Sequence, residues 1–244
     1  MKHLGILGHS AEGAALCFTT FCRAGSEELG SYEHPDVTLD CVSFVRCMPA
    51  YDRGDYDAVR EVMAVSLRRL ADAGADFFVC PDNTVHLALE RPGPDLALPG
   101  LHIGDVVAEE AARNGHAKVG VLGTRYTMEG PVYPRALGGH GIEAVVPSES
   151  EREVVNRIIF GELVHGIITD ESRTEYLRVI DALAERGCDA VALVCTEIPL
   201  LVTPAASPLP TLDSTRLIAY AALGVAVGHD PVPNWRGGPR PQRE

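Results

Sequence analysis

The hydrophobic and polar positions of this chain alternate between the spacing of buried strands and the spacing of helices. Short apolar runs typical of strands occur at Leu4–Leu7, Val37–Val45, Phe77–Cys80, Val119–Leu122, Ile142–Val146 and Ala190–Val194. Between them, two stripes of apolar side chains recur at helical spacing: Val59, Val62, Met63, Leu67 and Leu70, and then Tyr176, Leu177, Ile180, Leu183 and Ala184. Gly74 and Gly187 follow these stripes and are expected to stop the helices. Both stripes are expected to pack in a core. The alternation predicts parallel sheets flanked by helices.

The pattern is duplicated along the chain. Residues 70–86 align without a gap on residues 183–199, at a shift of 113 positions, with Leu70/Leu183 and Asp76/Asp189 in register. The opening HLGILGHS is echoed by KVGVLGTR at a shift of 115. Two segments with nearly the same shift indicate a repeated strand–helix–strand unit. The same alignment places Asp82 opposite Cys195, each directly after a strand.

The repeat predicts an α/β fold of two similar lobes related by a pseudo-twofold axis, with the active site in the cleft between them. We expect residues 1–105 plus 208–228 to form an N-terminal lobe, residues 106–207 a C-terminal lobe, and residues 229–244 a tail. Pro-rich segments at 91–100 and 203–213 are expected to connect the lobes, with a helix after each. Asp213 or Ser214 is the expected N-cap of the last helix. The tail, rich in Pro, Gly and Arg, is expected to fray or to dock on a neighbour.

Length, charge and cysteine usage restrict the class of protein. A chain of 244 residues that is 46% hydrophobic can bury a large core. A net charge of −13 argues against nucleic acid or an anionic membrane as the main partner. Seven cysteines without scaffold-like spacing favour a reducing compartment. No apolar run approaches the roughly 20 residues of a membrane span, and the opening segment is typical of a strand rather than a signal peptide. We therefore expect a soluble, cytoplasmic protein.

Two polar clusters carry candidate chemistry. Cys195, at the end of a strand and before an expected helix, would lie near backbone N–H groups, which lower a thiol pKa and bind carboxylates. A buried structural cysteine is the alternative, and the other cysteines are expected in the core, except that Cys80 could point to the same side of the strand as Asp82. Asp82 could donate or accept a proton, pair with a substrate ammonium, or cap a helix. His86, one helical turn further on, is expected to be structural.

The Asn-Thr-Val-His run, the CTEIPLL run, the GTRYTM loop and the LHIGD segment together resemble the aspartate/glutamate racemase family, from GILG to about Val225. The resemblance implies two α/β lobes with a small carboxylate substrate between them and two opposed catalytic residues, the second of which is Cys195. The first position, a cysteine in the family, is Asp82 here. By resemblance, Asn83, Thr84, Thr124, Thr127, Thr196 and Glu197 would hold the substrate, with Ser10 a further candidate. The family needs no cofactor, and no phosphate loop, metal-ligand cluster or lysine motif stands in this sequence.

Three functions remain open at this point. The favoured one is a cofactor-independent amino-acid racemase or epimerase in which Asp82 and Cys195 transfer protons on opposite faces of Cα. The second is a related lyase or cis-trans isomerase, decarboxylase-like, that uses Cys195 alone while Asp82 orients the substrate. The third is an inactive binding homologue. We expect a homodimer. No specificity-setting arginine can be assigned among Arg46, Arg53 and Arg125.

Overall fold

The computed structural model describes residues 1–240 and forms two compact units. Among the described residues, unit 1 comprises Met1–Ile103 together with residues 215–240, and unit 2 comprises Gly104–Ser214. Each unit has its own parallel sheet and its own hydrophobic core. The predicted fold class, parallel sheets flanked by helices, is confirmed.

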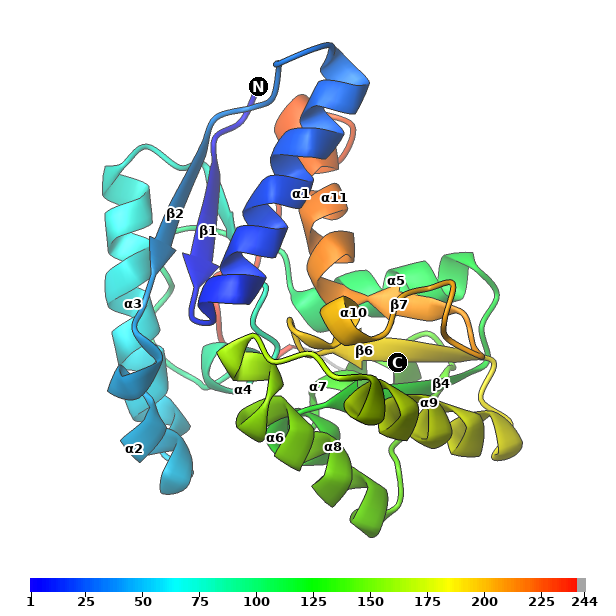
Figure 1. Ribbon diagram of the computed structural model, residues 1–244. Helices are drawn as coiled ribbons and strands as arrows, with labels where there is room; N and C mark the ends of the chain where they lie inside the picture. The colour runs from blue at the N-terminus through cyan, green and yellow to red at the C-terminus, as the bar shows by residue number, and fades with distance from the viewer. Residues whose placement is uncertain (241–244) are drawn as a thin grey trace. The chain divides into compact units, whose positions relative to one another are not determined.

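Unit 1 is built on a sheet with strand order β2-β1-β3, from Val37–Cys41, Leu4–Gly8 and Phe77–Val79. The long helices α1 (Ala11–Leu29) and α3 (Tyr56–Asp72) contact β1 and β2 and cover opposite faces of the sheet (Figure 1). The predicted stripe of α3 faces the core, because Val59, Met63, Leu67 and Leu70 are fully buried. The remaining elements of this unit are η1 (Phe44–Arg46), α2 (Met48–Asp52), α4 (His86–Leu89) and α11 (Ser214–Val227), whose first residue belongs to unit 2.

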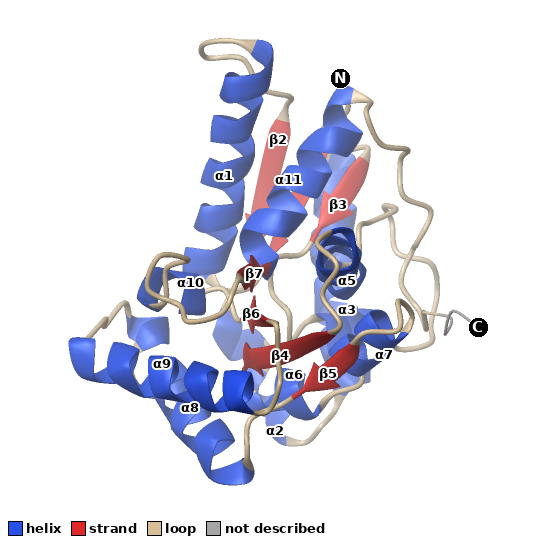
Figure 2. Cartoon of the chain, turned by 90° about the vertical axis from the view of Figure 1, so that its right-hand side faces the viewer, coloured by secondary structure: helices blue, strands red, loops and turns tan. Residues whose placement is uncertain are grey.

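Unit 2 has strand order β5-β4-β6-β7, from Glu143–Val145, Lys118–Gly123, Ala190–Val194 and Thr211–Asp213. Its helices α8 (Glu149–Gly161) and α9 (Asp170–Glu185) pack against each other (Figure 2). Tyr176, Ile180 and Leu183 of α9 are fully buried, as the second stripe predicts. The remaining elements are α5 (Ile103–Arg113), α6 (Arg125–Glu129), α7 (Val132–Gly138), η2 (Leu163–His165) and α10 (Ile198–Leu201).

The sequence repeat corresponds to a repeat of hydrogen bonds. Asp76 accepts a bond from the backbone N–H of His3 at 2.8 Å, and Asp189 accepts one from Ala117 at the same distance. Each aspartate therefore ties the start of a third strand to the start of the central strand of its sheet. Gly74 and Gly187, which follow the ends of α3 and α9, have φ of 92° and 85°. Both lie in the left-handed region that favours glycine after a helix.

The repeat extends beyond the aligned segments. In unit 2, the N–H of Val191 donates to the carbonyl of Pro210 at 2.9 Å, which joins β6 to β7. In unit 1, the N–H of Phe78 donates to the carbonyl of Pro99 at 2.9 Å, beside an isolated parallel bridge between Phe78 and Gly100. The segment after each copy thus adds the same contact to its sheet, as a strand in one copy and a single bridge in the other.

One predicted strand ends too late, and one strand was not predicted. The run Val37–Val45 is a strand only to Cys41, and Phe44–Arg46 form a 3-10 turn. The last pair between β1 and β2 joins Gly8 to Cys41, so residues beyond Cys41 have no partner strand there. The sequence also did not predict β7, because three residues are too few to show a period.

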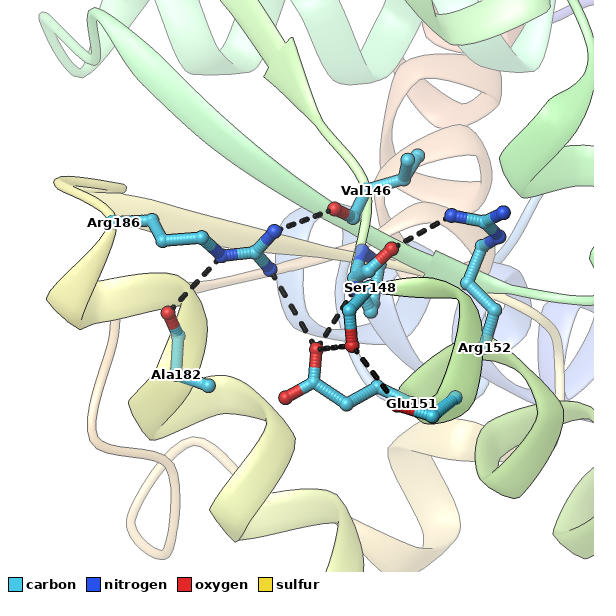
Figure 3. Close-up of polar contacts among 8 residues, drawn as sticks. Val146, Ser148, Glu151, Arg152, Ala182 and Arg186 are labelled. Atoms are coloured by element: carbon cyan, nitrogen blue, oxygen red, sulfur yellow. Dashed lines mark hydrogen bonds and ion pairs between the residues drawn. The ribbon is translucent and has the colours of Figure 1, made fainter.

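The start of α8 carries a capping box (Figure 3). The side chain of Glu151 accepts hydrogen bonds from the N–H of Ser148 at 2.8 Å and from its hydroxyl at 2.7 Å. Arg186, which follows α9, lies 4.0 Å from the same carboxylate oxygen and donates to the carbonyl of Val146 at 3.0 Å. One carboxylate therefore connects the start of α8 to the end of α9.

Of the two alternatives expected for the tail, fraying or docking on a neighbour, the residues up to 240 show docking, and the neighbour is the tail's own unit. Trp235 is 7% exposed and belongs to the hydrophobic core of unit 1. The N–H of Gly100 donates to the carbonyl of Trp235, and that of Leu96 to the carbonyl of Arg236, both at 2.8 Å. Burial of one large indole, together with these backbone bonds, is sufficient reason for the tail to dock on its own unit. Residues 241–244 lie outside the described residues.

Candidate active site

The predicted site residues of unit 1 follow the carboxyl ends of two adjacent strands. Ser10 comes two residues after β1, and Asp82 three residues after β3. These strands pair in parallel, with Ile6 opposite Val79, so their carboxyl ends lie at the same edge of the sheet. In parallel α/β sheets this edge is where ligands bind.

Asp82 is held in a defined position by the backbone that follows it. Its Oδ1 atom accepts hydrogen bonds from the N–H groups of Thr84 at 3.1 Å and Val85 at 3.4 Å. The residue is 9% exposed, and Asn83 is 2% exposed. Asp82 therefore bonds the turn before α4 and is not the N-cap of that helix, which is Val85. The two N–H donors stabilise its negative charge.

The hydroxyl and thiol groups near Asp82 are kept protonated. Burial and then the negative charge of Asp82 raise the pKa of the Tyr51 hydroxyl well above its ordinary value. The same two causes raise the pKa of the Cys80 thiol. Burial also raises the pKa of Cys47, although the charge of Arg46 partly opposes it. None of these three groups is prepared to act as a base at neutral pH.

Tyr51 and His9 were not predicted to belong to this region. Tyr51 is 4% exposed, and the His9 ring lies 6.0 Å from its ring and 4.7 Å from that of Phe44. The Nδ1 atom of His9 lies 3.1 Å from the carbonyl oxygen of Val42. These contacts join the segment after β1 to η1 and α2, which are distant in sequence, so no local pattern could have indicated them.

The predicted site residues of unit 2 also follow adjacent strands. The last pair between β4 and β6 joins Gly123 to Val194, so Thr124 and Cys195 are the next residues on neighbouring strands. Thr124 caps α6, accepting from the N–H of Thr127 at 3.3 Å, and the two hydroxyl oxygens lie 3.0 Å apart. Thr196 is 4% exposed. The structure thus brings together at one edge the four predicted residues Thr124, Thr127, Cys195 and Thr196.

Cys195 is hydrogen-bonded to Glu197, a residue that the sequence predicted to bind the substrate. Its thiol donates a hydrogen bond to Oε2 of Glu197 at 3.1 Å. Cys195 is 7% exposed and Glu197 is 4% exposed. A buried carboxylate at this distance accepts the hydrogen bond of the thiol and so fixes the direction of the Cys195 proton.

The expected helix after Cys195 is wrong in one respect. α10 contains only four residues, so its dipole is too short to lower the pKa of a thiol. The carboxylate of Glu197 is the neighbour that acts on the Cys195 proton. Pro199 lies in the first turn of α10, where proline is favoured, and the backbone becomes extended at Val202, which ends the helix.

Of the remaining residues considered in the sequence, two cysteines lie differently from expectation and the others do not contradict it. Cys41 is exposed and Cys22 partly exposed, whereas Cys17, Cys47 and Cys188 are buried as predicted. Arg46, Arg53 and Arg125 are all exposed, and none of them is fixed as a specificity-setting group. His86 is fully buried, with Nε2 3.1 Å from the carbonyl oxygen of Cys80, in agreement with a structural role.

Two properties of the described residues bear on the class of protein. Across residues 1–240, no helix combines the length and apolar character that crossing a membrane requires. Within the same residues, His, Cys, Asp and Glu side chains form no group of three or more that could hold a metal ion. In each of the two parallel α/β units, a titratable side chain, Asp82 or Cys195, lies within three residues of the end of the third strand.

Known proteins share this architecture. Residues 19–222 match the model of the Asp/Glu/Hydantoin racemase family. A candidate Asp/Glu racemase from Yersinia pestis is 34% identical, with a TM-score of 0.81 over 93% of this chain and 100% of its own. An aspartate racemase homologue from Pyrococcus horikoshii OT3 is 26% identical, with a TM-score of 0.77 over the same shares. The broad specificity amino-acid racemase RacX of Bacillus subtilis is 23% identical over 72% of this chain and 75% of its own.

The chain belongs to the Asp/Glu/hydantoin racemase family. The resemblance seen in the sequence is thereby confirmed, and so is the expected enzyme class, an isomerase of the racemase type.

Proposed function

We propose that this protein racemises or epimerises an amino acid, or a related small carboxylate, without a cofactor. Asp82 and Cys195 are the two proton-transfer groups and act on opposite faces of Cα. The observation that carries the proposal is the buried hydrogen bond from the Cys195 thiol to Glu197. It fixes the thiol of Cys195 in one direction, as an acid/base group that acts on one face of Cα must be.

In one direction, the thiolate of Cys195 takes the α-proton and becomes a thiol. The electron pair of the broken C–H bond is delocalised into the substrate carboxylate. Protonated Asp82 then delivers its proton to the opposite face of Cα and becomes a carboxylate. In the other direction, the carboxylate of Asp82 removes the α-proton and the thiol of Cys195 returns one. The two directions therefore begin from opposite protonation states of the pair.

The substrate's charged groups are proposed to bind the small polar side chains at the two strand edges. These are Asn83, Thr84, Thr124, Thr127, Thr196 and Ser10. Ser10 and Thr124 already accept backbone N–H bonds as helix caps, from Gly13 at 3.3 Å and from Thr127 at 3.3 Å. A hydroxyl that accepts through a lone pair can still donate its proton to a carboxylate. Capping and substrate binding are thus compatible at both residues.

A second function is favoured by the way in which Asp82 is held. Two backbone N–H groups bind its Oδ1 atom, as they would bind a carboxylate that orients a substrate without exchanging protons. Cys195 would then act alone, as in a lyase or cis-trans isomerase. The two functions differ in one product: only a racemase yields the mirror-image substrate.

The cell compartment and assembly are proposed on the character of the whole chain. Seven free cysteines, together with a net charge of −13, fit a cytoplasmic protein. A homodimer is the proposed assembly, and sedimentation velocity would contradict it by showing only the mass of one 26.1 kDa chain.

The test is exchange of the Cα proton for deuterium, followed by NMR on a panel of D- and L-amino acids. Wild-type protein should exchange and invert at least one of them. Cys195→Ser should reduce the rate on the order of 10²-fold or more, since a hydroxyl is a far weaker acid than a thiol. Cys188→Ala is the matched control, a buried cysteine of the same unit that should remain active. Equal rates in Cys195→Ser and wild type would refute the assignment.

A further inference from the structure

The C-terminal tail of this chain, residues 231–240, is hydrogen-bonded to unit 1 and packs in its core. Its backbone bonds to the segment before α5 through Leu96 and Gly100, and the N–H of Gly238 donates to the carbonyl of Leu89 at 2.9 Å. Trp235 packs in the same core cluster as Phe78 and Leu89. The match to the family model ends at residue 222, so the tail lies outside it.

The indole of Trp235 lies against two buried imidazoles. It stacks on His86, with ring centroids 6.0 Å apart and planes inclined by 13°. It meets His102 edge-on at 4.9 Å, and the two imidazoles are 4.6 Å apart. His102 is itself held by Glu90, whose Oε1 lies 2.7 Å from its Nε2. Two neighbouring rings, one of them held by a carboxylate, therefore fix the orientation of His86.

His86 acts in turn on the segment that carries Asp82. Its Nε2 lies 3.1 Å from the carbonyl oxygen of Cys80, the residue after β3. The Cys80 thiol bonds the carbonyl oxygen of Asp82 at 3.7 Å. α4, which follows this segment, has only four residues and offers little support of its own. A continuous set of contacts thus runs from the tail to the backbone of Asp82.

We propose that the tail is a positioning element for Asp82, with Trp235 and His86 as its positioning residues. Trp235 holds the imidazole of His86 in the orientation that binds the Cys80 carbonyl. That bond holds the turn in which Thr84 and Val85 donate to the Asp82 carboxylate. The proposal rests on the proposed function only for the catalytic role of Asp82; the mechanical link stands on the contacts.

Hydrogen exchange tests the link without a substrate. In Trp235→Ala, the amides of Thr84 and Val85 should exchange about 10-fold faster or more. Local opening of this turn would cost less free energy, because the contacts of Trp235 with His86 are lost. His86→Gln should reproduce the effect at the same two amides, and Trp235→Phe should restore most of the protection. Val232→Ala is the control, since Val232 is a tail residue that is 43% exposed. It should exchange like wild type.

Proton exchange at Cα tests the functional consequence. Trp235→Ala should slow removal of the α-proton on the Asp82 face by on the order of 10²-fold, as a small misplacement of a catalytic group can. Exchange on the Cys195 face and the KM should stay near wild type.

The outcomes separate the two proposals. Faster amide exchange throughout β1 and β3 in Trp235→Ala would overturn the positioning role, because Trp235 would then only fill the core. Unchanged exchange at Thr84 and Val85 would overturn it equally. If no amino acid is racemised, the proposed function fails while the amide measurements still decide the link.

Discussion

The thiol of Cys195 donates a hydrogen bond to the carboxylate of Glu197 at 3.1 Å. A thiol and a carboxyl have reference pKa values of about 8.5 and 4.3, so in water the proton stays on sulfur. Burial disfavours both charged forms, and a substrate carboxylate or ammonium at the site changes the balance between them. Glu197 is therefore the residue that we expect to set how much thiolate is available.

Glu197→Gln tests this expectation. Glutamine keeps the size of the side chain but removes the negative charge, which disfavours a thiolate beside it. Alkylation of Cys195 by iodoacetamide, followed by mass spectrometry of its peptide, should therefore be about 10-fold faster at neutral pH. Glu162→Gln serves as the control in the same unit. Alkylation at the wild-type rate in Glu197→Gln would show that the carboxylate does not hold the thiol in its protonated form.

A second residue-scale effect concerns Glu151 at the start of α8. Burial raises its pKa, but hydrogen bonds from Ser148 and the charges of Arg186 and Arg178 lower it below the ordinary value overall. A lowered pKa in the folded state contributes stability that is present above the ordinary value and lost as pH falls through the folded value. The capping box should thus weaken in acid.

Glu151→Gln should lower the free energy of unfolding by about 1 kcal/mol at pH 7, the usual contribution of a cap. The difference from wild type should shrink below about pH 4, where an unperturbed glutamate becomes protonated. Urea unfolding at a series of pH values measures it, with exposed Glu149→Gln as the control. A difference that grows in acid would contradict the sign.

At the scale of elements, β6 approaches the end of β4 closely at Gly123, the residue before Thr124. This approach constrains the position of Thr124. A Cβ on Gly123 would lie 2.7 Å from the carbonyl oxygen of Val194, an atom of the neighbouring strand backbone that cannot rotate away. Gly138, at the end of α7, has no atom within 4 Å of the same position. The two glycines form a matched pair.

Gly123→Ala should cost about 1–3 kcal/mol of stability, as overpacking does. Gly138→Ala should be neutral or stabilise the protein by up to about 1 kcal/mol, because alanine is the better helix former. Thermal unfolding of both variants measures the contrast. Equal stability would mean that β4 and β6 are not as close at this edge as described.

The elements that could be predicted from the sequence are those with a period or a repeat. α3, α9 and β6 follow from apolar spacing, and the shift of 113 links the two copies. The end of β2 at Cys41 could not be predicted, because it depends on where β1 ends. Three-residue β7 exists through its pairing with β6. Trp235 stands alone in a Pro- and Gly-rich segment, so nothing near it in the sequence indicates a core residue.

The site shows the same division. The positions of Asp82, Thr124 and Cys195 at the carboxyl ends of parallel strands could be predicted from the strand–helix alternation. The proximity of Tyr51 and His9 could not, since it joins α2 to the segment after β1, far apart in the sequence. The bond between Cys195 and Glu197 depends on side-chain directions in a short turn, which residue spacing does not fix.

At the scale of the whole molecule, the proposed function needs one proton-transfer group from each unit. The two groups, a carboxyl and a thiol, differ in acidity. The reference pKa values of an aspartate and a cysteine differ by roughly 4.6 units, or about 6 kcal/mol in favour of carboxylate and thiol. Burial of Asp82 and the carboxylate near Cys195 change this gap without making the groups alike. Equilibrium between the enantiomers must still be 1:1, so the inequality can appear only in individual rate constants.

The most direct test is the initial rate of Cα deuterium incorporation, measured separately for the D- and L-forms of the best substrate, in wild type, Asp82→Asn and Asp82→Cys. Wild type should exchange one enantiomer much faster than the other. Asp82→Cys should bring the two rates closer, and Asp82→Asn should abolish inversion while the Cys195 face still exchanges. Normal inversion by Asp82→Asn would contradict the account and leave Asp82 as an orienting group.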